Sequence, residues 1–321
     1  MLLDFFLVIF GFVALLFGGE LLVRGGVNTA RKLGVRPFII GLTLVAFGTS
    51  APELMVSIRA LLIGHADIVM GNAIGSNIAN ILLVIGVSAL ITPISGGLLG
   101  PRPQASFLFG VTFIFGCFSL GGTFVWYHGL LMVVFLLTYF NWSFKREEPS
   151  ATERNLLPEE IPDSLGTLKK ISESSALPII FMVCGMALLL LGAQFLVEGS
   201  VSVARKMGVS EAVIGLSLIA IGTSLPELAT SLIASYRGHM SLAVGNIVGS
   251  NIFNLFGVVG ITSLIDVVPV PLEIITIDLW VMGGATIVLC GFMLVGCAIT
   301  RSAGAGLFML YAVYMCHLWV R

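Results

Sequence analysis

One stretch of this chain occurs twice and constrains its fold more than any other feature. Residues 41–86 (GLTLVAFGTSAPELMVSIRALLIGHADIVMGNAIGSNIANILLVIG) match residues 215–260 (GLSLIAIGTSLPELATSLIASYRGHMSLAVGNIVGSNIFNLFGVVG) without a gap, and about half of the positions are identical. Each copy places a glutamate, Glu53 or Glu227, inside a run apolar enough to lie in lipid. An acid buried in a membrane segment is costly and is therefore a candidate functional residue. Its recurrence in register predicts that the two glutamates serve one site.

The composition sets the class of protein. Hydrophobic residues make up 57% of the chain and charged residues 10%, against about 25% charged in a typical soluble domain. The mean hydropathy is +1.07. These values predict an integral membrane protein that crosses the lipid bilayer several times. The net charge of −1 and the absence of a basic stripe argue against a nucleic-acid partner. No cofactor and no protein partner follow from the sequence.

A spanning helix needs roughly 20 apolar residues. On that rule the chain is predicted to be an all-α membrane protein with ten transmembrane helices, at about 3–23, 37–62, 67–91, 105–121, 124–143, 176–198, 211–236, 240–265, 272–297 and 303–320. The first apolar run is too long for a signal-peptide core and is expected to remain as a helix. The five cysteines lie scattered in apolar segments without CxxC spacing and are expected to be small buried hydrophobes.

Lysine and arginine placement predicts the orientation. With the N-terminus outside, the cytoplasmic side collects Arg24, Arg31, Lys32, Arg36, Arg102, Lys145, Arg146, Arg154, Lys169, Lys170, Arg237 and Arg301. The opposite side keeps only Arg59, Arg205, Lys206 and Arg321. We therefore expect both termini outside, and an inner (plasma) membrane location if the source is prokaryotic.

The repeat also predicts the domain organisation. We expect a first five-helix repeat at 1–144, a cytoplasmic linker at 145–175 and a second five-helix repeat at 176–321. Because five is an odd number, the second copy enters the membrane from the opposite side. Two homologous halves of inverted topology are typical of an alternating-access transporter whose site lies at the midplane.

The repeated GTSxPE motif brings oxygen atoms together. A proline inside a helix removes one hydrogen bond, so Pro52 frees the carbonyl of Gly48, and the second copy repeats this arrangement. Thr49 and Glu53 are four residues apart and share a helix face. Each motif thus offers a carboxylate, hydroxyls and loosened carbonyls. Hard cations such as calcium prefer such oxygen ligands.

The helix after each motif carries a second polar face. Side chains four residues apart line it in both copies: Asn72, Ser76, Asn80, and Asn246, Ser250, Asn254. These residues would either complete an ion site or hydrogen-bond one helix to the next, and the sequence leaves both readings open.

Other polar residues in apolar segments receive simpler interpretations. Glu20 lies inside a span, but its repeat partner is Gln194, which argues against a primary ligand. Asp278 lies near a predicted helix end and is expected to reach the interface. His65 and His239 stand beside glycines and are expected in interfacial turns.

The motifs GTSAPE with GNAIGSNIAN, and GTSLPE with GNIVGSNIFN, resemble the two alpha-repeats of the cation/calcium antiporter superfamily, in particular its bacterial and archaeal sodium/calcium exchangers. The resemblance covers nearly the whole chain. It implies a ten-helix fold whose second, third, seventh and eighth helices form a core, across which the first and sixth helices slide. It also implies calcium ligation by the side chains of Glu53 and Glu227 and by the backbone carbonyls of Thr49 and Thr223. The implied sodium sites comprise Ala46, Ser50, Glu53, Ser76, Asn80, Ala220, Ser224, Glu227, Ser250 and Asn254.

These observations favour a secondary active antiporter that exchanges calcium for sodium, both of them substrates. Two carboxylates are neutralised by one divalent or by two monovalent cations, so occupation is exclusive. A calcium/proton, or other divalent cation/proton, antiporter is the nearest alternative. A passive cation channel is an alternative from another class. An enzyme is not expected, because no HExxH motif and no nucleophile with a histidine base appear within the spans.

Overall fold

A computed structural model describes residues 2–146, 176–207 and 222–320. Its elements are predominantly helical. The first part of the chain contains α1 (Leu2–Leu33), α2 (Pro37–Ile40), η1 (Gly41–Val45), α3 (Ala46–Thr49), α4 (Ala51–Leu62), α5 (Asp67–Ile78), η2 (Ala79–Ile85), α6 (Gly86–Ile91), η3 (Gly96–Leu98), α7 (Arg102–Ser119), β1 (Thr123–Phe124) and α8 (Trp126–Arg146). The remainder contains α11 (Leu177–Lys206), α14 (Leu225–Tyr236), α15 (Met240–Ile252), η6 (Phe253–Val258), α16 (Val259–Ile265), β2 (Val268–Pro269), η7 (Ile274–Asp278), α17 (Leu279–Val295) and α18 (Arg301–Val320).

Seven helices in the described part of the chain are long and apolar enough to cross a membrane. They are Leu3–Leu33, Pro37–Leu62, Asp67–Ile91, Trp126–Lys145, Leu177–Lys206, Met240–Ile265 and Ile274–Val295. Three of the predicted spans, 37–62, 67–91 and 240–265, agree with the structure at both ends. Two predicted spans that are not among these seven, 105–121 and 303–320, overlap α7 and α18. A third, 211–236, lies partly outside the described residues, and its described part contains α14. The count of ten spans stays a prediction.

The first helix is longer than predicted. The sequence suggested an end near residue 23, before Arg24, but α1 continues to Leu33. Arg31 and Lys32 lie in its last turn, where cations interact favourably with the helix dipole. The first basic residue after the apolar run, Arg24, therefore does not mark the end of the helix. The predicted span 176–198 likewise continues to Lys206.

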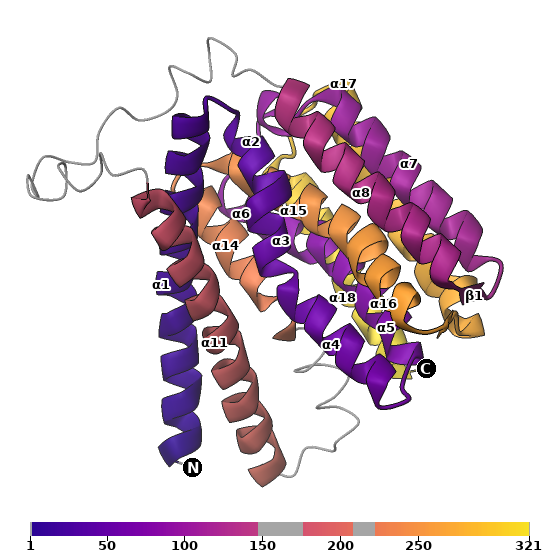
Figure 1. The fold of residues 1–321 in the computed structure, drawn as a ribbon. Coiled ribbons are helices and arrows are strands. Elements are labelled where there is room, and N and C mark those ends of the chain that lie inside the picture. Colours follow the sequence, from indigo (N-terminus) through magenta and orange to yellow (C-terminus); the bar gives the residue numbers. More distant parts are fainter. Residues whose placement is uncertain (1, 147–175, 208–221, 321) are drawn as a thin grey trace, which may run out of the picture.

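Helices α1 and α11 form a pair along one edge of the bundle (Figure 1). Glycines let their backbones approach closely. A Cβ atom on Gly18 would lie 2.8 Å from the backbone nitrogen of Leu189, and one on Gly185 would lie 2.6 Å from that of Leu22. Such small-residue contacts are a common way for membrane helices to associate. The two helices therefore pack as a unit.

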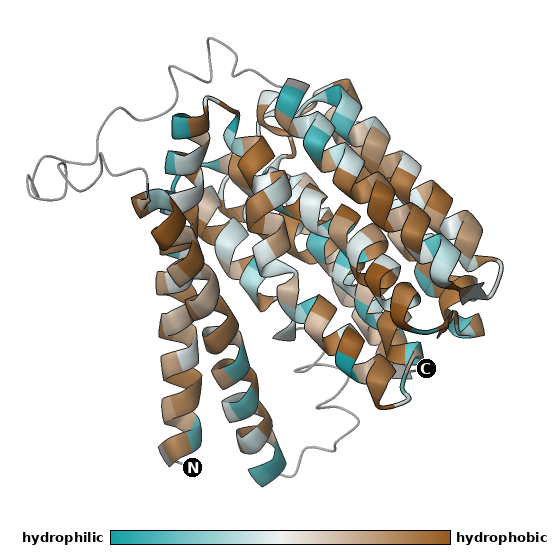
Figure 2. Cartoon of the chain, viewed as in Figure 1, coloured by the Kyte–Doolittle hydropathy of each residue, from teal (hydrophilic) through white to brown (hydrophobic). Residues whose placement is uncertain are grey.

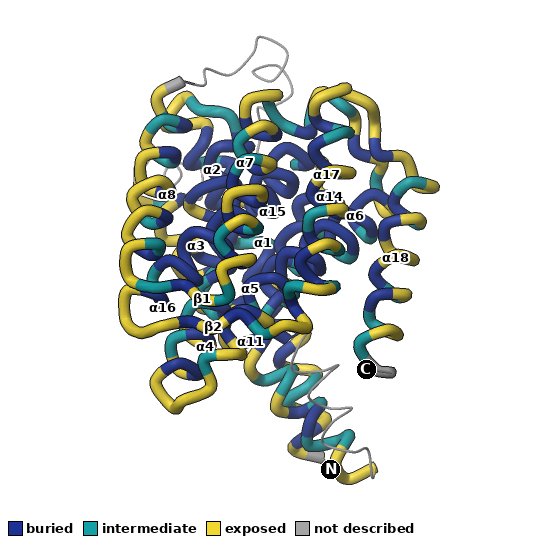
Figure 3. Tube along the Cα trace, turned by 90° about the vertical axis from the view of Figure 1, so that its right-hand side faces the viewer, coloured by how far each residue is buried: buried dark blue, intermediate teal, exposed yellow. Residues whose placement is uncertain are grey.

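Helix α15 lies at the centre of the bundle and is surrounded by other helices. In the span Met240–Ile265, 89% of the most apolar window is buried inside the protein, against 28% for Leu177–Lys206. Every residue of α15 is buried. Figure 3 shows this central dark-blue segment surrounded by helices that alternate between buried and exposed residues. The outer helices carry long hydrophobic stretches, as Figure 2 shows for α1, α8 and α11.

Two short backbone pairings tie loops together. Strands β1 and β2 pair antiparallel, with Phe124 opposite Val268. A separate antiparallel bridge joins Ile94 to Ile299. Ile94 and Val268 are repeat equivalents, and their partners differ by nearly the same offset. The two links are therefore related to each other as the two copies of the motif are.

One polar residue lies where the sequence analysis did not place it. Asp278 was expected to reach the membrane interface, but it is buried and accepts a 3.0 Å hydrogen bond from the Tyr314 hydroxyl. The expectation was wrong because α18 packs against this residue and supplies a hydrogen-bond donor inside the protein. The two histidines do lie in turns. Burial lowers the pKa of His239, which favours a neutral imidazole at pH 7.

Candidate ion-binding site

Both glutamates stand at the start of a helix that begins inside the protein. Helix α3 ends at Thr49 and α4 begins at Ala51, with Ser50 between them in a non-helical conformation (φ −87°, ψ 7°). Ser224 has nearly the same conformation before α14 (φ −87°, ψ 4°). The proline of each motif occupies the first turn, where its missing N–H costs nothing. The predicted disruption is thus a complete helix break.

The break places each carboxylate in the first helical turn, near the positive end of the helix dipole. Glu53 and Glu227 are fully buried, with 0% of their surfaces exposed. A negative charge is stabilised at a helix N-terminus. That stabilisation, about 0.3–1 kcal/mol when exposed and up to about 2 when partly buried, is smaller than the several kcal/mol that burying an ion costs. Further partners are required.

Serine hydroxyls supply part of that need, and one of them crosses between the repeats. Ser50 donates to Glu227 Oε1 at 2.9 Å, over a separation of 177 residues. Ser250 donates to the same oxygen at 3.5 Å. In the first repeat Ser76 donates to Glu53 Oε1 at 3.4 Å. The repeats therefore meet at their acids.

Further hydroxyl contacts cross between the repeats around each carboxylate. Ser224 donates to the Ser76 hydroxyl at 3.4 Å, and Ser76 in turn contacts Glu53. On the other side, the Thr49 and Ser250 hydroxyls lie 3.4 Å apart. Thr49 also donates to Asn246 Oδ1 at 3.1 Å. Each glutamate thus has its own group of hydroxyl contacts, and each group includes a serine from the helix break of the other repeat.

Each glutamate keeps one oxygen without a partner. Glu53 Oε2 and Glu227 Oε2 are buried and accept no hydrogen bond from the residues that the structure describes. Within the described residues no lysine or arginine forms an ion pair with either acid. The purely structural role, a membrane glutamate paired with an arginine, therefore has no support here. Two buried carboxylate oxygens without a donor are suited to a cation ligand.

The residues of the predicted polar faces make two kinds of contact. Asn72 donates 2.9 Å hydrogen bonds to the Glu53 carbonyl and to the Ser57 hydroxyl. Its equivalent, Asn246, donates to Ser231 at 3.4 Å. These two asparagines join helices together. Ser76 and Ser250 contact the acids instead.

Asn80 and Asn254 lie in π-helical segments, η2 and η6, at equivalent positions of the repeats. Both are fully buried. Asn80 donates to Asn251 Oδ1 at 3.1 Å. Within the described part of the chain, Asn80 Oδ1 and both amide atoms of Asn254 have no hydrogen-bond partner. Single π-helical turns are frequent at functional sites, and here they carry the last asparagine of each face.

A further asparagine pair was missed by the sequence analysis. Asn77 donates to the Asn251 carbonyl at 3.1 Å, and the two residues are repeat equivalents. The four-residue spacing used for the polar face does not include them. Their presence in both GSN segments of the repeat was the signal that could have found them.

The remaining predicted ligands divide by location. Ala46 is buried, and its carbonyl accepts a 2.9 Å hydrogen bond from the Ser50 N–H and a 3.4 Å bond from the Thr49 hydroxyl. Thr223 is half-buried, and its hydroxyl does not bond to either acid in the described part of the chain. Ala220 lies outside the described residues.

This arrangement has a defined chemical capacity. In the described ranges no three His, Cys, Asp or Glu side chains gather. The site therefore offers two carboxylates together with neutral hydroxyl, amide and carbonyl oxygens. Such a ligand set suits hard cations and does not suit soft transition metals, which prefer thiolate or imidazole.

Comparison with known proteins identifies the family. The model for sodium/calcium exchanger proteins matches residues 3–145 and 177–320. The sodium/calcium exchanger MaX1 of Methanosarcina acetivorans is 32% identical over 98% of both chains. The putative antiporter CaxA of Alkalimonas amylolytica is 39% identical over 90% of this chain and 89% of its own.

A solved structure agrees in fold. The sodium-calcium exchanger NCX_Mj, soaked with sodium and calcium, superposes with a TM-score of 0.84 at 28% identity, and the match covers 98% of each chain. The resemblance deduced from the repeated motifs is thereby confirmed. The chain is a multi-pass membrane protein and belongs to the sodium/calcium exchanger family.

Proposed function

We propose that this protein is a secondary active antiporter that exchanges calcium for sodium by alternating access. The cation site is formed by Glu53 and Glu227, with the hydroxyls of Ser50, Ser76 and Ser250 around them. One observation carries the proposal. The helix-break serine of each repeat contacts the acid of the other repeat, directly in Ser50–Glu227 and through Ser76 in Ser224–Ser76–Glu53, and each buried carboxylate keeps one oxygen without a donor among the described residues.

The charge of this site explains exchange. Two carboxylates in a low-dielectric interior carry about −2, and an unbalanced charge there is expensive. One calcium ion balances that charge, and two sodium ions do so as well. Because the two kinds of ion need the same oxygens, one displaces the other. The amide oxygens of Asn80 and Asn254 add neutral ligands without changing this balance.

Alternating access follows from an inverted arrangement of ten helices in two repeats, at 1–144 and 176–321, joined by a cytoplasmic linker at 145–175. The family model supports this division, since it matches the chain in two stretches on either side of the linker. The α1–α11 pair, packed through its glycines, is the body that moves against the core. Both termini lie outside the cell membrane.

Counter-transport in proteoliposomes tests the function. Purified protein is reconstituted, and calcium uptake is followed with either a sodium gradient at clamped pH or a proton gradient without sodium. Uptake that requires the outward sodium gradient supports the proposal. Uptake driven by the proton gradient alone identifies the calcium/proton antiporter, and uptake without any counter-ion identifies a channel.

A further inference from the structure

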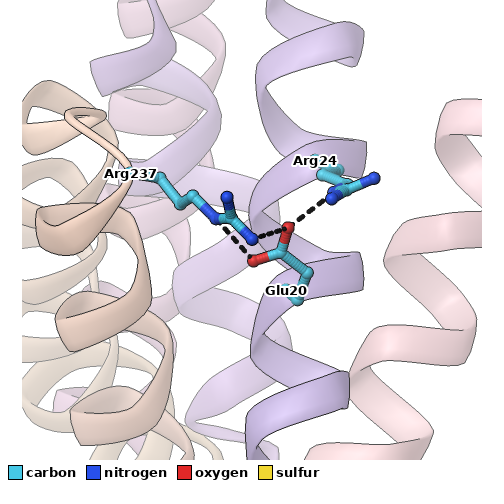
Figure 4. A network of polar contacts seen from close by, with 3 residues as sticks. All are labelled: Glu20, Arg24 and Arg237. Atoms are coloured by element: carbon cyan, nitrogen blue, oxygen red, sulfur yellow. Dashed lines mark hydrogen bonds and ion pairs between the residues drawn. The ribbon is translucent and has the colours of Figure 1, made fainter. Parts of the chain in front are cut away.

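Glu20 of α1 is a membrane-span acid that the proposed ion site does not use. Its Oε1 accepts a 2.6 Å hydrogen bond from Arg24 Nε, four residues later in the same helix. Arg237 approaches from another part of the chain: its Nε donates to Oε2 at 3.0 Å, and its Nη2 lies 2.9 Å from Oε1. Figure 4 shows the two arginines on either side of the carboxylate. The Glu20–Arg237 contact is bidentate, the stronger geometry for this pair.

This contact joins the α1–α11 pair to the core. Arg237 directly follows α14, whose first turn carries Glu227. Gly19, the residue before Glu20, contacts the same helix: a Cβ atom on Gly19 would meet the side chain of Ile233 in α14. The charged pair and the Gly19–Ile233 contact therefore lie along one boundary between α1 and α14.

The repeat shows that this ion pair has no counterpart. The equivalents of Glu20 and Arg237 are Gln194 and Ile63, which carry no charge. Gln194 donates a 2.9 Å hydrogen bond to Glu198 within α11, in place of the Glu20–Arg24 pair. A contact between Gln194 of α11 and Ile63, which follows α4, could not form the same ion pair.

We propose that Glu20 and Arg237 form a one-sided latch that biases the exchanger toward the access state in which α1 packs against α14 as it does here. The inference rests on the proposed alternating access. In an inverted-repeat transporter, the two states exchange the roles of the halves, so identical halves would give equal populations. A contact present in one half only shifts that balance. Movement of α1 along α14 separates Glu20 from Arg237 but leaves Arg24 beside Glu20.

The size of the bias follows from exposure. The side chains of Glu20 and Arg237 are 21% and 49% exposed, so solvent screens their attraction. Pairs of this kind change an equilibrium by about two- to fivefold. The latch therefore tunes the equilibrium and does not lock it, as a transporter that must cycle requires.

The test measures the two conformers directly. Spin labels are placed at the exposed positions Leu33 on α1 and Tyr127 on α8, in full-length protein whose native cysteines are replaced, and the distance distribution is recorded in ion-free detergent or lipid. Arg237→Gln and Glu20→Gln are each expected to lower the population of the conformer seen here by about two- to fivefold. The double variant is expected to equal either single one, and the exchanged pair Glu20→Arg with Arg237→Glu to restore the original population.

Arg24→Gln is the matched control, because it removes an arginine from the same carboxylate without crossing the helix boundary. Its population is expected to stay at the parent value. An unchanged population in Arg237→Gln, or an equal shift in Arg24→Gln, overturns the latch. The distance measurement does not depend on transport activity. If the parent protein fails to exchange calcium, the proposed function is contradicted, while the latch is still tested by the distances between the spin labels.

Discussion

The two copies of the motif have the same residues at the site but different hydrogen bonds. Among the described residues, Glu227 accepts hydrogen bonds from two serines, one of them in the other repeat, whereas Glu53 accepts a side-chain hydrogen bond from Ser76 alone. Ser224, the equivalent of Ser50, donates to Ser76 and not to a carboxylate. A repeated sequence therefore does not produce a symmetric site. The hydrogen bonds that each repeat makes at the site therefore depend on the position of the other repeat as well as on its own sequence.

The largest effect is expected at the acids themselves. Glu53→Gln and Glu227→Gln each remove half of the site charge while keeping the side-chain shape, so calcium no longer finds a balanced site. Exchange measured as radioactive calcium uptake in proteoliposomes should fall by about 100-fold or more in both variants. The elution profile in detergent serves as the check on folding. Near-normal uptake by either variant would show that this glutamate is not a cation ligand and that the two repeats do not contribute equivalent acids to the site.

A smaller effect should distinguish the two serines of the helix breaks. Ser50→Ala removes a hydrogen bond to a carboxylate, which is worth about 1.5–3 kcal/mol, whereas Ser224→Ala removes one between hydroxyls, worth about 0.5–1.5 kcal/mol. The sodium concentration for half-maximal calcium exchange should therefore rise about tenfold in Ser50→Ala and about threefold in Ser224→Ala. Equal shifts would show that the asymmetry seen here does not extend to the working site.

The smallest effect is expected in stability, at the two π-helical asparagines. Asn80→Ala breaks a hydrogen bond to Asn251, whereas Asn254→Ala removes an amide whose two polar atoms have no partner. Asn80→Ala should lower the free energy of unfolding by about 1 kcal/mol more than Asn254→Ala. Thermal unfolding in detergent measures this difference, and the two variants control for one another because they delete the same atoms. A larger loss in Asn254→Ala would mean that its amide supports the fold.

Much of the fold could be predicted from the sequence because the signals were local. The spans 37–62, 67–91 and 240–265 end at turns such as Gly64-His65 and Gly238-His239, where both glycines have positive φ. At Pro52 and Pro226 the sequence predicted the loss of one helical hydrogen bond, whereas the structure has a non-helical serine before each proline-containing helix. The end of α1 was missed because Arg24 belongs to a helix that extends beyond the apolar run.

Part of the candidate site could not be predicted for a different reason. The residue types and their spacing predicted that Glu53 and Glu227 would serve one site. The sequence does not specify which hydroxyl faces which acid, because the Ser50–Glu227 bond depends on the relative position of two halves separated by 177 residues. The π-helical segments around Asn80 and Asn254 were also missed, because a π-helical turn changes the backbone hydrogen bonds without changing the hydrophobic pattern of the sequence.

The complete burial of α15 has a consequence for the way the protein senses its surroundings. This segment carries Asn246 and Ser250, yet none of its residues reaches the outer surface. Acyl chains cannot touch it, so a thicker or thinner bilayer acts first on the peripheral helices and reaches the ion ligands only through them. Lipid composition is thus expected to alter how fast the exchanger turns over more than how tightly it holds its ions.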